Sequence, residues 1–265
     1  MDNFFEEHGI ASNRIFHVHT FRCGHAENVP DKAYVEVALE LGASDIWFTD
    51  HAPFPDDPFG ARMKFSELDE YLRTLTELKE QYHNINIHIG LETEYFPSFD
   101  KSGYYEYLRS RPEIEMLLLG QHMAEVSATP LSYSFSESAE YLDKNEYNLL
   151  GKAIVEGAKT GYFDAIAHPD RIFRRCDSWD SNMEKMSVAI IQSAINADIL
   201  LEMNLASAEN PIYLKQEFWE LVPETAKRIV GYDAHSVDEL KSRFIMARNK
   251  CLTFFTGLDT IIDKG

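Results

Sequence analysis

The sequence is poor in positive charge and in cysteine. Its 265 residues carry 25 Lys+Arg against 44 Asp+Glu, which gives a formal net charge of −19 and a pI of about 4.9. Nucleic acids and anionic membranes bind clustered Lys and Arg, so this deficit argues against both kinds of partner. Three cysteines, Cys23, Cys176 and Cys251, are an odd number at unrelated spacings, which argues against a disulfide framework and favours a reducing compartment.

The sequence also lacks a segment that would carry the chain into or across a membrane. The first residues, Met1–Glu7, show no basic region followed by an apolar stretch, and no uninterrupted apolar run is long enough to span a bilayer. No linker rich in Pro, Gly or Ser and no internal repeat divides the sequence. We therefore expect a cytoplasmic protein that folds as a single domain over residues 1–265.

What the sequence does contain is an alternation of short apolar, β-branched runs with longer amphipathic stretches. This alternation is typical of consecutive strand and helix units, and it predicts an α/β fold with a parallel sheet or barrel. Seven strands are expected, at Ile15–Thr20, Asp45–Asp50, Ile85–Glu92, Met116–Gln121, Phe163–His168, Ile199–Asn204 and Arg228–Asp233.

Cap residues mark the limits of several helices. Helices over Asp31–Leu41 and Glu137–Thr160 are each followed by a glycine that would end them. Capping patterns that begin at Ser66 and Ser236 open two further helices. Two long loops that could line a site are expected at Ala52–Arg62 and Glu125–Ser138.

Histidine and acidic residues gather at the predicted strand ends. In the first strand, the period of two places His17 and His19 on one face, about 6–7 Å apart, where one metal ion could bind both. In parallel α/β barrels and sheets, ligands bind at the carboxyl ends of the strands. The residues found at these ends are His17, His19, Asp50, His51, Glu92, His122, His168, Asp170, Asp233 and His235.

Each of these residues has a simpler explanation when it is taken alone. A single His after an apolar run is more often a hydrogen-bonded core residue than a ligand, and Asp233 could merely belong to a helix cap. Repetition at strand ends along the whole chain is what favours a metal site. His8, His83 and His88 lie outside this pattern and are expected to be structural, as is Cys23, although it is close to a histidine in sequence.

Seven motifs follow one another along the chain: His17-Val18-His19-Thr20, Cys23-Gly24-His25, Thr49-Asp50-His51, Gly90-Leu91-Glu92, Gly120-Gln121-His122, Ala167-His168-Pro169-Asp170 and Asp233-Ala234-His235. In this order they resemble the polymerase and histidinol phosphatase (PHP) family, and most of all its stand-alone histidinol-phosphatase branch. The surrounding residues Arg62-Met63 and Glu92-Thr93-Glu94-Tyr95 are also similar to that branch.

The resemblance implies a distorted (βα)7 TIM-like barrel of the PHP type, with three divalent metal ions at its mouth. Two acidic residues and seven histidines would be the metal ligands. They are His17, His19, Glu92 and Asp233 at the first ion, His122 and His168 with the bridging Glu92 at the second, and His25, His51 and His235 at the third.

This ligand set fits hydrolytic chemistry. Imidazole and carboxylate ligands suit Zn, Mn, Fe or Co, and ligand type does not choose among these metals. Two ions about 3.5–4 Å apart, bridged by Glu92, could share a hydroxide near neutral pH that attacks a phosphomonoester in line. Three divalent ions would also make the site strongly positive in an otherwise acidic protein.

Other side chains would assist this reaction. Arg171, and with it Arg62, would stabilise the charge that develops on the phosphate, although Arg171 could equally belong to a solvated basic cluster. The leaving alcohol needs a proton, for which Asp233, Asp170 or metal-bound water are candidates. Asp50 is expected to accept a hydrogen bond from the ring nitrogen of a ligand histidine that does not bind metal, and so to orient that ring.

The expected activity is that of an L-histidinol-phosphate phosphatase in histidine biosynthesis. Two departures from the branch leave another small phosphomonoester, or a phosphodiester, open as the substrate: no Arg follows Glu202-Met203-Asn204, and Tyr232 stands where the branch usually has Ser. A non-catalytic, metal-binding regulatory domain is a third alternative, against which the intact ligand set argues.

Overall fold

The seven expected strands form one parallel sheet. The computed structural model describes residues 13–128, 131–133, 146–210 and 212–248 of the chain. The strands lie in the order β1-β2-β3-β4-β7-β8-β9, so that chain order and spatial order agree. Their bounds are β1 (Arg14–Val18), β2 (Asp45–His51), β3 (Asn86–Thr93), β4 (Met116–Leu119), β7 (Ala165–Ile166), β8 (Leu200–Asn204) and β9 (Arg228–Gly231).

The sheet curls into a nearly closed barrel because its first and last strands meet. Val18 and Ala234 form a parallel bridge. The Tyr232 N–H donates to the Phe16 carbonyl at 2.7 Å, and the His19 N–H donates to the Ala234 carbonyl at 2.9 Å. The (βα)7 TIM-like barrel expected from the sequence is therefore confirmed.

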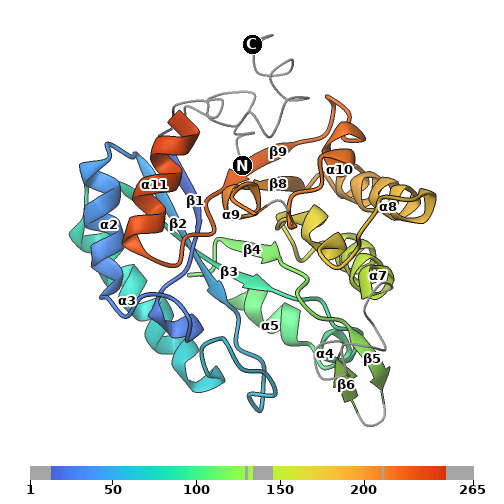
Figure 1. Cartoon of the computed structure of the whole chain (residues 1–265). Coiled ribbons are helices and arrows are strands. Elements are labelled where there is room, and N and C mark those ends of the chain that lie inside the picture. The colour runs from blue at the N-terminus through green and yellow to red at the C-terminus, as the bar shows by residue number, and fades with distance from the viewer. Residues whose placement is uncertain (1–12, 129–130, 134–145, 211, 249–265) are drawn as a thin grey trace.

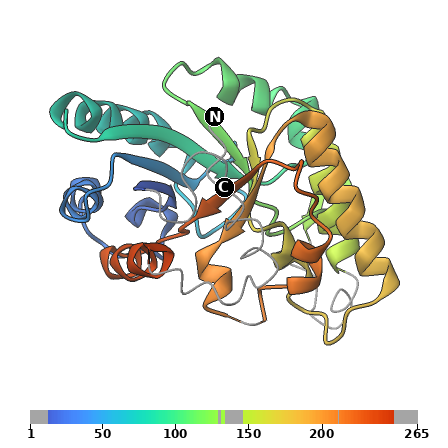
Figure 2. The same ribbon diagram turned by 90° about the horizontal axis from the view of Figure 1, so that it is seen from above.

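Helices lie around the outside of the barrel, as Figures 1 and 2 show. In α3 (Leu68–Gln81), the buried side chains Leu68, Leu72 and Leu75 recur every three to four residues and form the apolar stripe that packs inward. The remaining helices are α2 (Asp31–Glu40), α4 (Pro97–Lys101), α5 (Tyr104–Ser110), α7 (Glu146–Lys159), α8 (Ser181–Ala197), α9 (Leu205–Ala208), α10 (Gln216–Glu220) and α11 (Val237–Arg248), with 3₁₀ turns η1 (Phe21–Cys23), η2 (Phe65–Glu67) and η3 (Pro169–Phe173).

The expected helix ends are largely found. Helix α2 stops before Gly42, whose φ of 76° is left-handed. At the start of α11 the Glu239 N–H donates to Ser236 Oγ at 3.1 Å, as the capping pattern predicted. The pattern at Ser66 begins as the 3₁₀ turn η2 before α3. The helix expected over Glu137–Thr160 is described from Glu146 onward, and its first part lies outside the described residues.

Two expectations need correction. The segment Glu125–Ser138 is not simply a loop, because β5 (Glu125–Ala128) pairs with β6 (Leu131–Tyr133) in an antiparallel hairpin. The rest of that segment lies outside the described residues. The strand expected to reach His168 ends at Ile166, since the backbone turns out of the sheet at His168, where φ is 29°.

His88 has structural contacts, as the sequence predicted. Its ring stacks on Trp47 with centroids 3.9 Å apart. Its Nδ1 lies 2.8 Å from Glu115 Oε2, and its Nε2 lies 3.2 Å from Asp45 Oδ1. Although burial raises the pKa of Glu115, hydrogen bonds from His88 and Lys79 lower it to about 2. His8 lies outside the described residues.

We expect Glu115→Gln to lower the free energy of unfolding at pH 7 by about 0.5–1 kcal/mol, because the ion pairs that it breaks are partly exposed. The folded-state pKa of Glu115 lies below the ordinary value of 4.5. Its contribution is therefore full above pH 4.5 and declines as the pH falls toward 2. Urea unfolding at pH 7 and pH 3 should show the difference between wild type and variant shrinking; equal stability at pH 7 would contradict this account.

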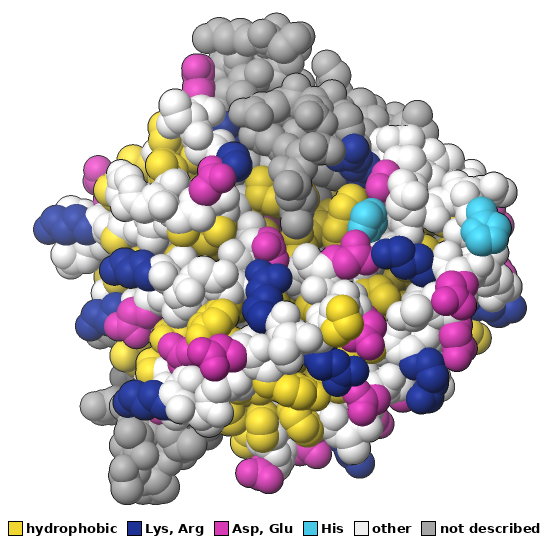
Figure 3. Space-filling model, turned by 180° about the vertical axis from the view of Figure 1, so that it is seen from behind, with side chains coloured by type: hydrophobic (Ala, Val, Ile, Leu, Met, Phe, Trp, Pro, Cys, Tyr) yellow, Lys and Arg dark blue, Asp and Glu magenta, His cyan; other side chains and the backbone are white. Residues whose placement is uncertain are grey.

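The surface carries charges of both signs. On the face seen in Figure 3, acidic and basic side chains are interspersed. Some of these charges form ion pairs, such as Lys227 with Asp198, 2.7 Å apart. Within the part of the chain that the structure describes, no helix has the length and apolar character needed to cross a bilayer.

Candidate metal centre

A bulge near the end of strand β1 places His17, and His19 just after the strand, at the barrel mouth. The register between β1 and β2 shifts between Ile15 and Val18, and His17 has a φ of 68°. This bulge replaces the regular alternation on which the sequence prediction relied. The Nε2 atoms of His17 and His19 nevertheless lie 2.9 Å apart, so the structure brings the two rings together by a different backbone path.

Glu92, near the end of β3, lies at the centre of the histidines. Its side chain is 1% exposed, and its two carboxylate oxygens face different groups of imidazoles. Oε2 lies 3.3 Å from His17 Nε2, 3.4 Å from His19 Nε2 and 3.2 Å from His51 Nδ1, whereas Oε1 lies 3.0 Å from His168 Nε2 and 3.6 Å from His122 Nε2. A carboxylate between two groups of ligands is in the position that a bridging ligand requires.

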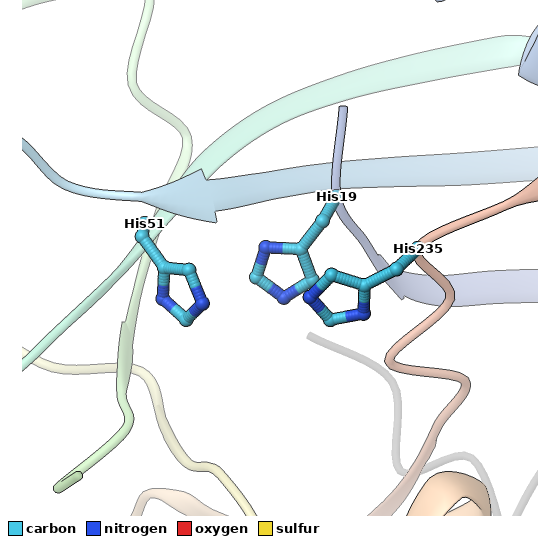
Figure 4. A group of neighbouring side chains, drawn as sticks. All are labelled: His19, His51 and His235. Atoms are coloured by element: carbon cyan, nitrogen blue, oxygen red, sulfur yellow. The ribbon is translucent and has the colours of Figure 1, made fainter. Parts of the chain in front are cut away.

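A second carboxylate and two further histidines complete the cluster. Asp233 Oδ1 lies 3.4 Å from His19 Nε2. Figure 4 shows the rings of His19, His51 and His235 pointing toward one another, with the centroids of His19 and His235 4.3 Å apart. The His25 ring lies beside them, 4.6 Å from that of His235. All nine side chains that the sequence nominated as ligands thus lie in one cluster.

Three members of this cluster have strained backbones. His17, His168 and Asp233 have φ values of 68°, 29° and 50°, a region that residues other than glycine rarely adopt. Each such conformation costs about 1–3 kcal/mol and persists only where the surrounding structure enforces it. Strain at three candidate ligands therefore points to a functional site.

The protonation states of five of the nine clustered side chains suit metal binding. Burial lowers the pKa of His51 well below its ordinary value, that of His168 to about 4 and that of His235 to about 3, so these imidazoles are neutral at pH 7. Burial opposes ionisation of Glu92 and Asp233, but neighbouring histidines, and Arg171 beside Asp233, hold the pKa of both carboxyls well below the usual range. Neutral imidazole and ionised carboxylate are the forms that bind metal ions.

The residues present fit divalent metal ions. Sets of three ligand atoms lie within 4.8 Å of one another, among them His17 with His19 and Glu92, and His51 with Glu92 and His122. In the described part of the chain, His19 Nδ1 and His235 Nε2 are buried ring atoms without a hydrogen-bond partner. Buried polar atoms are normally paired, so a bound ion is the expected partner for this imidazole and carboxylate set.

Glu202 is a site residue that the sequence prediction missed. Its Oε1 lies 2.5 Å from His17 Nδ1, and its Oε2 accepts hydrogen bonds from the His168 N–H at 2.9 Å and from Asn204 at 3.1 Å. Burial would lower the pKa of His17, but carboxylates led by Glu202 raise it well above its ordinary value. A signal was present, since Glu202 also lies near the carboxyl end of a predicted strand.

Glu94 was missed as well, and it changes the interpretation of Arg62. The Arg62 guanidinium binds both Glu94 oxygens, at 2.9 and 3.0 Å, and Glu94 Oε1 lies 3.2 Å from His122 Nδ1. Arg62 therefore fixes the carboxylate that orients a ligand histidine, and its contact with phosphate stays a prediction. The strand period of two, which places Glu94 on the same side as Glu92, could have identified Glu94.

Arg171 lies inside the site. Its Nη2 donates to Asp233 Oδ2 at 2.8 Å, to Asn204 Oδ1 at 2.8 Å and to Ser207 Oγ at 3.0 Å. Its side chain is only 15% exposed. The alternative of a solvated basic cluster is therefore wrong for Arg171.

Two acids near the cluster have contacts that differ from the predicted ones. Asp170 Oδ2 accepts a hydrogen bond from the Lys215 N–H at 2.9 Å, and burial raises its pKa to about 6. Its role as a proton donor stays a prediction. Asp50 Oδ1 accepts a hydrogen bond from the Thr20 N–H at 2.8 Å, so Asp50 fixes the loop after β1. The carboxylates that contact ligand histidine rings from outside the cluster are Glu202 and Glu94, where the sequence had suggested Asp50.

The two described cysteines differ in burial. Cys23 is buried and Cys176 is half-buried, whereas Cys251 lies outside the described residues. The Cys23 sulfur lies within 4.8 Å of ring nitrogens of His25 and His235, so this cysteine borders the cluster.

Comparison with known proteins finds relatives along most of this chain. The chain is 28% identical over 243 residues to the "probable histidinol-phosphatase" of Deinococcus radiodurans, a match that covers 86% of this chain and 88% of the relative. The crystal structure of a candidate histidinol phosphatase from Listeria monocytogenes superposes with a TM-score of 0.71 at 20% identity, and covers 86% of this chain and 97% of that one.

A second solved structure shares the fold. The histidinol phosphate phosphatase of Lactococcus lactis, in complex with zinc, L-histidinol and phosphate, gives a TM-score of 0.62 at 18% identity and covers 88% of this chain and 92% of that one. The family model described as the PHP domain matches residues 16–206, which include most of the strands and seven of the nine clustered side chains. The chain belongs to the PHP domain family.

Proposed function

We propose that this protein is a metal-dependent phosphomonoesterase that converts L-histidinol phosphate and water into L-histidinol and phosphate. The relative from Deinococcus radiodurans, which this chain matches over 88% of that protein's length, is named a probable histidinol-phosphatase. The Lactococcus lactis structure holds zinc and both products of this reaction. A single domain over residues 1–265, which acts in the cytoplasm on a small phosphorylated substrate, is part of this proposal.

The observation that best supports this function is the position of Glu92 among five imidazoles. A carboxylate so placed would bridge two ions, and the His25, His51 and His235 group would hold a third. Bound divalent ions would supply hydroxide near neutral pH and a positive clamp for phosphoryl oxygens.

The side chains behind the ligands hold the site in its reactive geometry. Glu202 accepts the Nδ1 proton of His17, and Glu94 does the same for His122, so that the Nε2 atom of each ring is directed into the site. Arg171 presents its guanidinium beside Asp233, where it can neutralise charge on a transferring phosphoryl group. Asp170, with a pKa of about 6, is a carboxyl group near the site that can retain a proton close to neutral pH.

A substrate screen with the metal-loaded enzyme tests the proposed function. We expect kcat/KM for L-histidinol phosphate to exceed that for 4-nitrophenyl phosphate by about a hundredfold or more, since a pocket with matched polar groups discriminates at least this well. Equal values would assign the site to another phosphomonoester, and a preference for bis(4-nitrophenyl) phosphate would assign it to phosphodiesters. Absence of turnover on all three would contradict the enzyme assignment.

We expect Glu202→Gln to reduce metal affinity and turnover by about 10–100-fold, the usual cost of removing the partner of a ligand histidine. The amide loses the negative charge and can present an N–H to His17 Nδ1 in place of an acceptor. Metal titration with a chelating dye, together with kcat, measures the loss. Glu115→Gln, the same substitution remote from the cluster, should change neither quantity, and wild-type metal affinity in Glu202→Gln would refute the positioning role.

A further inference from the structure

Two arginines at one 3₁₀ turn lie beside the metal centre. Arg171 lies within η3, and Arg174 follows its last residue, with the Arg174 N–H donating to the Arg171 carbonyl at 3.1 Å. From this turn, which begins at the ligand His168, the two side chains reach different parts of the site. Arg171 contacts Asp233 after β9, and Arg174 contacts the carbonyl of His122 after β4.

A contact with His122 places Arg174 at the wall of the metal centre. Its Nη2 lies 3.4 Å from the backbone carbonyl of His122, whose ring faces Glu92. Its side chain is 21% exposed, so the guanidinium is neither deeply buried nor free in solvent. Arg174 thus borders the part of the mouth formed by His122 and His168.

The hydrogen bonds of the two arginines differ in kind. Arg171 donates from Nη2 to three acceptors, Asp233, Asn204 and Ser207, and from Nε to Ser207 at 3.2 Å. Arg174 makes a long bond to a carbonyl and an ion pair of 3.6 Å with Glu146. Among the described residues, most of its five N–H groups therefore stay available to an anion, whereas Arg171 is largely committed to its protein partners.

The charge around Arg174 is not balanced. Glu146 is 2% exposed and is shared, since Arg175 Nε lies 3.3 Å from the same Oε2 atom. One carboxylate therefore faces two guanidinium groups. A second anion beside Arg174 would restore the balance.

A phosphomonoester supplies such an anion. The segment 205–214, which follows β8 at the mouth, contains no Lys or Arg, so it adds no cation of its own. We propose that Arg174 is the second cation that binds the phosphate group of the substrate, from the side of the mouth formed by His122 and opposite the Arg171 contact with Asp233. This assignment rests on the proposed function and names a residue that determines substrate binding.

The test compares Arg174→Ala and Arg174→Lys with Arg175→Ala in the metal-loaded enzyme. Arg175 shares the Glu146 carboxylate, so its removal controls for the loss of an ion pair on that residue. A charge-assisted hydrogen bond lost from a binding site weakens binding by about tenfold or more. We expect KM and the inhibition constant of inorganic phosphate to rise about tenfold or more in Arg174→Ala, with bound metal unchanged, and to recover partly in Arg174→Lys.

Calorimetric titration with inorganic phosphate separates this proposal from the proposed function, because it needs no turnover. Weaker phosphate binding in Arg174→Ala, with wild-type binding in Arg175→Ala, supports the assignment even if L-histidinol phosphate is not the substrate. Wild-type phosphate affinity in Arg174→Ala would overturn it. Equal weakening in both alanine variants would also overturn it, since the effect would then come from an unpaired Glu146.

Discussion

Replacing Glu92 by alanine should leave a folded barrel that has lost bound metal and turnover together. The Glu92 carboxylate contacts both sets of imidazoles, those at Oε2 and those at Oε1. Without it, Asp233 is the one carboxylate left among the nine nominated ligands, so less negative charge remains to balance bound metal ions. We expect turnover to fall by more than about a hundredfold, beyond the effect of losing a residue that only supports a ligand.

Metal analysis after dialysis, measured beside kcat, is the decisive readout for Glu92→Ala. Glu77→Ala is the matched control, because it makes the same substitution on the exposed side of α3. Circular dichroism should show the same fold for both variants. Full turnover in Glu92→Ala would rule out a mechanism in which a bridged pair of ions supplies the hydroxide, whereas loss of metal and activity together would support it.

The position of the site was predictable because of how parallel strands are arranged. Apolar runs that end in His51, Glu92 or His168 identify strand ends without any knowledge of tertiary contacts. The carboxyl ends of parallel strands meet at one mouth, so these side chains had to converge. The order of the motifs then identified His25, which lies at none of the predicted strand ends.

The supporting contacts were harder to predict because they join distant parts of the chain. Glu202 and His17 are 185 positions apart, and no periodicity relates them. The bulge at His17 and the turn at His168 depend on left-handed backbone at residues that usually avoid it, so regular strand geometry gave the wrong path. Arg62 and Asp50 were given roles by their position in a motif, whereas their actual partners, Glu94 and Thr20, depend on side-chain direction.

The substitution Gly120→Ala is expected to reduce bound metal and turnover about as much as the loss of the Glu92 side chain does. A Cβ at Gly120 would lie 2.0 Å from Glu92 Oε1 and 2.6 Å from its Cγ, closer than real Cβ contacts allow. The Glu92 side chain is flexible, so it can turn aside at a modest cost in stability. Doing so removes its carboxylate from the five imidazoles that surround it.

Gly120→Ala should therefore separate stability from function. We expect the free energy of unfolding to fall by no more than about 1–3 kcal/mol, as for other overpacked sites, while bound metal and turnover fall by about a hundredfold. Gly60→Ala is the control, because a Cβ there meets no atom within 4 Å. Wild-type metal content in Gly120→Ala would show that Glu92 has room to keep its position. A loss of metal that matches Glu92→Ala would instead show that the missing side chain at Gly120 holds the bridging carboxylate in place.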